Sequence, residues 1–170
     1  MQRRRLLRVA EAIDALNTGL ARAVRWFALA MALIQFGIVI GRYVFGANAI
    51  WAQESVLYLH AALFMLAAGY TLLVDKHVRV DIFYAAASPA KRRWVNIFGH
   101  LFLLLPAMVA LAYWSWPSVR NSWAILEGPI SVGGIEAVFL LKSLIPLFCA
   151  LVAVQSFAAL IRLFLSDAEA

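Results

Sequence analysis

The side chains that could do chemistry in this sequence are two histidines and a few polar groups set within long apolar stretches. His60 and His100 lie in different stretches, and two histidines on neighbouring membrane helices can ligate a b-type haem. Counted from the stretch ends, His60 lies roughly 12 Å below one surface and His100 roughly 9 Å above the other. Across a core of about 30 Å the rings then differ in depth by roughly 9 Å, which argues against a shared iron. We therefore expect each histidine to hydrogen-bond to another helix or to a lipid headgroup.

Other catalytic chemistry has no motif here. The sequence lacks a Gly-rich phosphate loop and the GxSxG, HExxH and CxxC patterns, and its single cysteine, Cys149, excludes a disulfide scaffold. Gln35 is a single amide within its apolar stretch, and no stretch has an acid near its centre. A transported ion usually needs several convergent ligands or a carboxylate. We predict that the chain is not an enzyme, binds no cofactor or metal, and supports a translocation pathway carried by another subunit.

The composition indicates an integral membrane protein. Of the 170 residues, 65% are hydrophobic and only 14% are charged, against about 25% charged in an average soluble domain. This excludes a disordered chain and disfavours a soluble domain, which cannot bury so much apolar surface at this size. The net charge of +6 is then better explained by membrane orientation and anionic lipid than by nucleic acid.

Four apolar stretches approach or exceed the roughly 20 residues that a helix needs to cross the hydrocarbon core. They cover about 26–44, 52–74, 94–116 and 138–163. Pro106 and Pro146 lie inside the last two and are tolerated in membrane helices. We predict an all-α membrane protein with four transmembrane helices plus amphipathic interfacial helices, forming one domain over residues 1–170.

Basic residues set the predicted orientation. Twelve of the 15 lysines and arginines lie in residues 1–25, in residues 75–93 or at Arg162, and three lie on the other side. The excess predicts that both termini and the middle loop are cytoplasmic.

Local signals refine three segments. Residues 6–24, within the N-terminal segment 1–25, have the pattern of an amphipathic helix. The apolar face consists of Leu6, Val9, Ile13, Leu16, Leu20 and Val24, and the polar side mainly of Arg8, Glu11, Asp14, Thr18 and Arg22. This segment is either a helix on the cytoplasmic leaflet or an extension of the first span. Ser88 followed by Pro89 is typical of a helix start. Between Pro117 and Glu136, Gly-Pro and Gly-Gly pairs predict a loop with turns.

Two motifs point to a family. The first runs from Gly41 to Gly46 (GRYVFG) and continues to Trp51 and Glu54; the second is HVRVD, from His77 to Asp81. Together they resemble the small membrane subunit, DctQ-like, of tripartite ATP-independent periplasmic (TRAP) transporters. The resemblance covers essentially the whole chain, including its length and four spans.

The resemblance implies a function. In this family a periplasmic binding protein delivers a small organic anion, usually a carboxylate, to a heterodimer of the small subunit and a large multi-span permease. Uptake is driven by sodium across the bacterial inner membrane, and the small subunit braces the fixed part of the permease. The long segment 117–136 is similar to the branch often labelled for mannitol, chloroaromatic or 2-oxo-acid uptake. Because substrate choice resides in the binding protein, the resemblance leaves the substrate unassigned, with a monocarboxylate or 2-oxo acid as the first expectation.

The motif residues have structural interpretations. Arg42 can reach lipid phosphate or pair with Glu54, unless both are simply solvated at the interface. Trp51 is typical of an interfacial anchor. His77 and Asp81 flank Arg79 and either fix a turn by hydrogen bonding or lie in a solvated loop.

The predicted outer segment has an interpretation of its own. Arg120, Trp123 and Glu127 combine charge with an aromatic group, which suits a transient docking surface for the binding protein. The alternative is that Trp123 only anchors the segment in the lipid interface. Two alternatives to the transporter function stay open: a haem- or quinone-binding anchor of a respiratory enzyme, and a free-standing small channel or exporter.

Overall fold

The computed structural model describes residues 2–76, 87–129 and 131–165. The described residues are helical apart from short connections, and they contain four helical stretches long and apolar enough to cross a membrane. These are α1 (Gln2–Phe45), α2 (Ile50–Leu73), a combined third stretch from Pro89 to Ala124, and α6 (Val138–Leu165). The third stretch consists of α4 (Pro89–Phe98), the π-helix η1 (Gly99–Leu104) and α5 (Leu105–Ala124). The predicted all-α fold with four membrane-spanning helices is confirmed.

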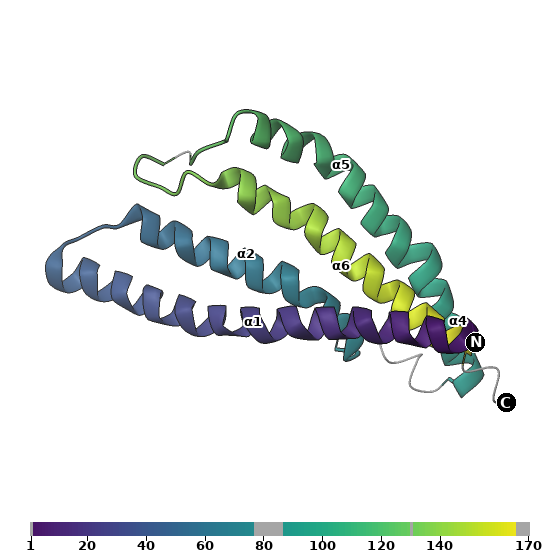
Figure 1. The fold of residues 1–170 in the computed structure, drawn as a ribbon. Helices are drawn as coiled ribbons and strands as arrows, with labels where there is room; N and C mark the ends of the chain where they lie inside the picture. Colours follow the sequence, from purple (N-terminus) through teal and green to yellow (C-terminus); the bar gives the residue numbers. More distant parts are fainter. Residues whose placement is uncertain (1, 77–86, 130, 166–170) are drawn as a thin grey trace.

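The helices form two hairpins that pack side by side (Figure 1). α1 and α2 form one hairpin, α5 and α6 form the other, and α6 contacts α1, α2 and α5. The most apolar 18-residue window of α6 is 39% buried, against 6% for each of the other three stretches. α6 is therefore the central helix, and the other three present most of their surface outwards.

The first helix is longer than the apolar stretch that predicted it. α1 runs without a break from Gln2 to Phe45, so residues 6–24 continue directly into the first span. This continuity favours the extension over a separate surface helix. Ala10, Asn17 and Val24 recur every seven residues and are buried, whereas Leu6 and Leu16 on the predicted apolar face are exposed. The N-terminal half of α1 is thus held by a narrow stripe packed against the bundle.

The turn after α1 explains the end of the GRYVFG motif. Gly46 has a φ of 64°, a left-handed conformation that glycine adopts without steric cost. The next backbone N–H, that of Ala47, donates to the Gly41 carbonyl at 2.9 Å and closes the helix end.

The third helical stretch begins as predicted and ends later than predicted. Ser88 caps α4 by accepting a hydrogen bond from the Lys91 backbone N–H, and Pro89 occupies the first turn. At the far end, α5 continues through Pro117 to Ala124, so the placement of residues 117–124 in a loop is wrong. The π-helix lies between these two ends and finishes at Leu104, two residues before Pro106. Pro106 has no N–H to donate, and the widened π-helical turn accommodates this loss.

Candidate functional site

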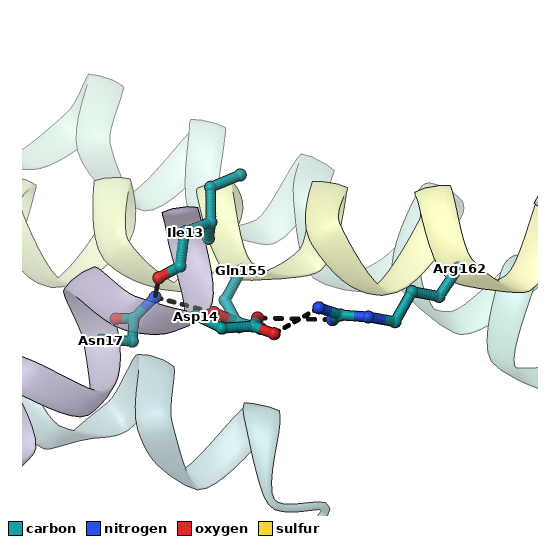
Figure 2. A network of polar contacts seen from close by, with 5 residues as sticks. All are labelled: Ile13, Asp14, Asn17, Gln155 and Arg162. Atoms are coloured by element: carbon teal, nitrogen blue, oxygen red, sulfur yellow. Dashed lines mark hydrogen bonds and ion pairs between the residues drawn. The ribbon is translucent and has the colours of Figure 1, made fainter. Parts of the chain in front are cut away.

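Four polar side chains connect α1 to α6 near the start of α1 (Figure 2). Asn17 Nδ2 donates to Gln155 Oε1 at 2.8 Å, and Gln155 Nε2 donates to Asp14 Oδ1 at 2.9 Å. Arg162 completes the set by donating from both terminal nitrogens to the Asp14 carboxylate. We call Asp14, Asn17, Gln155 and Arg162 the α1–α6 network. Its geometry follows from helical spacing, because residues three apart on α1 and seven apart on α6 share a face.

Two members of the α1–α6 network are buried, so losing their hydrogen-bond partners would lower the stability of the fold. Gln155 is 1% exposed and Asn17 is 0% exposed, and a buried amide without partners costs about 1–3 kcal/mol. The Asn17 amide also donates to the Ile13 carbonyl at 3.4 Å. On its other side it lies against Gly69 of α2, where a Cβ would overlap the Asn17 side chain. Three helices therefore meet at Asn17, and Gly69 provides the space for it.

The two histidines occupy separate positions. His100, in the π-helix, places Nδ1 2.8 Å from Ser156 Oγ of α6, so the expected hydrogen bond between helices is confirmed for this residue. His60 lies on the exposed surface of α2. The arrangement does not favour a haem between them. Among residues 2–76, 87–129 and 131–165, no group of three or more His, Cys, Asp or Glu side chains could hold a metal ion.

A second set of contacts lies at the opposite end of the bundle, where α5 turns into α6. Lys142 Nζ donates to Glu127 Oε2 at 2.5 Å, and this ammonium group lowers the pKa of the Glu127 carboxyl. Trp123 Nε1 donates to Ser143 Oγ at 2.7 Å. The Trp123 and Phe139 rings pack edge to face, with their centroids 4.7 Å apart. We call Glu54, Trp123, Glu127, Lys142 and Ser143 the loop cluster.

Glu54 ties α2 to the same connection. Its Oε2 accepts a hydrogen bond from the Ile135 backbone N–H at 2.6 Å. A Cβ on Gly134 would overlap the Glu54 carboxylate, so the absence of a side chain there permits the contact. The α5–α6 connection is thus held from three helices: by Glu54 of α2, by Trp123 of α5, and by Lys142 and Ser143 of α6.

Arg42 and Glu54, the two motif residues that the sequence offered as a pair, do not interact with each other. Among the described residues, Arg42 forms no ion pair with Glu54; Arg42 Nη2 donates to Asn48 Oδ1 at 3.3 Å. Gln53 donates to the same oxygen at 2.9 Å, so Asn48 of the 46–49 turn is held by one side chain from α1 and one from α2. Trp51 is exposed at the start of α2, and a Cβ on Gly41 would meet open space. His77 and Asp81 lie outside the described residues.

The three predicted docking residues are placed differently from one another. Arg120 is exposed on α5 and lines a cavity of ≈ 340 Å³ with Trp116, Trp123 and Pro146. Trp123 and Glu127 are engaged within the chain by Ser143 and Lys142. Arg120 and Trp123 belong to a helix, and only Glu127 belongs to the connecting segment.

Sequence reasoning missed the α1–α6 network. Asp14 was assigned only to the polar side of the N-terminal segment, and Gln155 was not singled out. A signal was present: Gln155 is an amide deep in an apolar stretch, and such a group nearly always faces protein. Together, the two sets of contacts have a structural role: they fix the positions of four helices relative to each other.

The chain is similar to known transporter components. A family model described as "Tripartite ATP-independent periplasmic transporters, DctQ component" matches residues 31–166. A relative from Vibrio cholerae serotype O1 (strain ATCC 39315 / El Tor Inaba N16961), the C4-dicarboxylate TRAP transporter small permease protein DctQ, is 29% identical over 100 residues. The matched region is 59% of this chain and 41% of the relative's length.

Proposed function

The chain belongs to the DctQ family of tripartite ATP-independent periplasmic transporters, and from this premise we propose that it is the small permease subunit that braces a large permease. The observation that carries the bracing role is that both polar sets connect helices within the chain. The α1–α6 network joins α1 to α6, and the loop cluster joins α2, α5 and α6. A subunit whose polar side chains bond to one another is suited to hold its shape while a neighbouring subunit moves.

The outward faces are suited to a large membrane partner. Along α1, bulky apolar side chains are exposed at regular intervals, and α5 presents others: Leu29, Leu33, Phe36, Val39, Tyr113 and Trp114. These faces contact lipid or another membrane helix equally well, since both are apolar. Gln35 is also exposed, and an amide at mid-span is costly in lipid. We place the large permease subunit against the side of α1 that carries Gln35.

The proposed placement is the bacterial inner membrane, with both termini cytoplasmic. The start of α1 and the end of α6 lie at one end of the bundle, and the connecting residues 46–49, 125–129 and 131–137 lie at the other (Figure 1). The 12:3 division of basic residues assigns the first end to the cytoplasm. Because α6 packs against α1, α2 and α5, we treat residues 1–170 as one membrane domain.

The proposed transport reaction is sodium-driven uptake of a small organic anion delivered by a periplasmic binding protein. The relative's name specifies C4-dicarboxylates for that protein; for this chain we propose the carboxylate class, with a monocarboxylate or 2-oxo acid as the first substrates to test. The binding protein is proposed to dock partly on the α5–α6 end, where Arg120 is exposed. Arg120→Glu should then lower uptake at limiting binding protein and leave complex assembly intact.

The function is tested by reconstituting the complex. This chain, a candidate large subunit and a binding protein are purified, and uptake of labelled substrate into liposomes is followed with and without an inward sodium gradient. We expect the two membrane subunits to co-purify and uptake to require both. A stable solitary chain, together with normal uptake after its deletion, would contradict the proposal, and an absorbance band of bound haem would favour the respiratory anchor.

A further inference from the structure

A basic cleft opens between α1 and α2 near the end that carries most of the positive charge. Its volume is ≈ 400 Å³, and its lining includes Thr18, Arg22 and Arg25 of α1 and Leu63, Ala67 and Tyr70 of α2. It is separate from the α1–α6 network, in which Asp14 binds Arg162. Neither the family match nor the relative assigns a ligand to this cleft.

The cleft combines two kinds of wall. Arg22 and Arg25 are three residues apart, so both guanidinium groups lie on one face of α1, and Arg25 also packs on the Trp26 ring at 5.3 Å. Two neighbouring guanidinium groups match the geometry of a phosphate, to which each can donate two hydrogen bonds. Leu63 and Ala67 form an apolar floor beside them. Such a site suits a ligand with a phosphate at one end and hydrocarbon at the other.

The depth of the cleft agrees with this ligand. Arg25 lies 21 residues before Gly46, which follows the end of α1. At 1.5 Å per residue, Arg25 is about 30 Å from the turn at the far end of that helix. That distance is about the thickness of the hydrocarbon core, so the arginines are level with the phosphates of the opposite leaflet.

We propose that this cleft binds one anionic phospholipid, with its phosphate between Arg22 and Arg25 and an acyl chain over Leu63 and Ala67. The proposal rests on the membrane placement given above. Basic pockets between membrane helices on the cytoplasmic side are established receptors for anionic headgroups. Filling the cleft with lipid seals the hairpin of α1 and α2 at its open end, where the helices would otherwise expose a charged gap to the bilayer.

The test counts lipids retained by the purified full chain in native mass spectrometry. The chain in mild detergent is titrated with phosphatidylglycerol, with phosphatidylcholine or with inorganic phosphate. We expect one tightly retained phosphatidylglycerol, weaker retention of phosphatidylcholine, and no displacement by excess phosphate. Arg22→Gln and Arg25→Gln should each weaken phosphatidylglycerol binding about fivefold, and the double variant about thirtyfold, because one basic side chain near an anionic surface contributes that much.

Two further variants separate a cleft from a charged surface. Arg8→Gln removes an exposed arginine of the same helix outside the cleft and should leave retention unchanged. Ala67→Phe fills the apolar floor without altering charge and should also lower retention at least fivefold. Equal losses in Arg8→Gln and Arg22→Gln, or full retention in Ala67→Phe, would overturn the proposal.

A protein ligand would give a different result. If the double arginine variant kept its lipid but no longer co-purified with the large subunit, the cleft would be a subunit contact and the proposal would be wrong. Binding of inorganic phosphate as tight as that of phosphatidylglycerol would likewise overturn it. The lipid measurement needs no transport, so its failure is distinguishable from failure of the uptake experiment.

Discussion

The α1–α6 network and the loop cluster lie at opposite ends of the same bundle and contain one ion pair each. The two pairs are similarly exposed: the side chains of Arg162 and Asp14 are 39% and 23% exposed, and those of Lys142 and Glu127 are both 31% exposed. The other members of the two sets differ in exposure. Asp14 accepts a hydrogen bond from Gln155, which is 1% exposed, whereas the loop cluster includes Trp123, which is 47% exposed and donates to Ser143.

This difference shows that an ion pair has to be judged with its neighbours. An exposed pair contributes about 0–1 kcal/mol, and either pair alone would be of that kind. In the α1–α6 network the carboxylate also satisfies a buried amide, so loss of one member leaves other buried polar groups without partners. In the loop cluster, water can reach the partly exposed side chains of Lys142 and Glu127. Both sets connect helices, and we expect the first set to contribute more to the free energy of unfolding.

Gln155→Leu should have the largest effect. The change leaves the Asn17 amide buried without its partner on α6 and removes a hydrogen bond from Asp14. We expect a loss of about 1–3 kcal/mol in the free energy of unfolding, which corresponds to a melting temperature lowered by roughly 5 °C in detergent. Gln35→Leu is the matched control, because it removes an exposed amide from another span. If both variants melted alike, burial would not be the feature that distinguishes the network.

The second test compares the two ion pairs directly by double-mutant cycles. Asp14→Asn, Arg162→Gln and their combination measure one coupling, and Glu127→Gln, Lys142→Gln and their combination measure the other. We expect about 1–2 kcal/mol between Asp14 and Arg162, because the contact is bidentate and shared with a buried amide. The coupling between Glu127 and Lys142 should be smaller. Strict additivity in the first cycle would mean that Arg162 is only a surface charge.

What the sequence predicts correctly are features with local causes. The four spans follow from apolar length, and the start of α4 follows from a serine cap followed by proline. The ends of α1 and α5 were predicted less well, since an apolar run marks the thickness of the membrane and not the length of the helix. Backbone hydrogen bonds continue past the run, so α1 begins at Gln2 and α5 continues through Arg120 to Ala124.

The candidate site was harder to predict because its contacts are not local. Asn17 and Gln155 are 138 residues apart in sequence, and Glu54 and Ile135 are 81 apart. Glu54 has a basic residue, Arg42, close to it in sequence, and yet it binds a backbone N–H of the distant connection. Sequence patterns identify which polar groups need partners, whereas the packing of α6 among the other helices decides which partners they find.

Trp123→Phe should have a modest effect confined to the loop cluster. The phenyl ring keeps the contact with Phe139 but loses the hydrogen bond to Ser143, which contributes about 0.5–1.5 kcal/mol. The exposed tryptophan is in contact with water, so we expect the lower half of that range. Ser143→Ala also removes the hydrogen bond from this hydroxyl to the Phe139 carbonyl, so it should cost at least as much, and the combined variant should lose no more than Ser143→Ala alone. A larger loss in the combined variant would mean that the two residues act separately. Thermal unfolding in detergent measures all three.

The smallest expected effect is a pH dependence carried by Glu127. Its hydrogen bond with Lys142 lowers the carboxyl pKa from the ordinary value of 4.5. A carboxyl whose pKa is lower in the folded chain stabilises folding fully above the unfolded value, and this contribution disappears as the pH falls through the folded value. Melting temperatures measured from pH 7 to pH 3 should therefore decline in the wild-type chain below about pH 4.5, by more than in Glu127→Gln.

Glu136→Gln, which changes an exposed acid of the same connection, should keep the wild-type slope. The difference between wild-type and Glu127→Gln curves isolates this one carboxylate, because the two chains are identical at every other position. Parallel curves would mean that the contact with Lys142 does not stabilise the connection in solution, and the contrast with the α1–α6 network would then be wider than proposed.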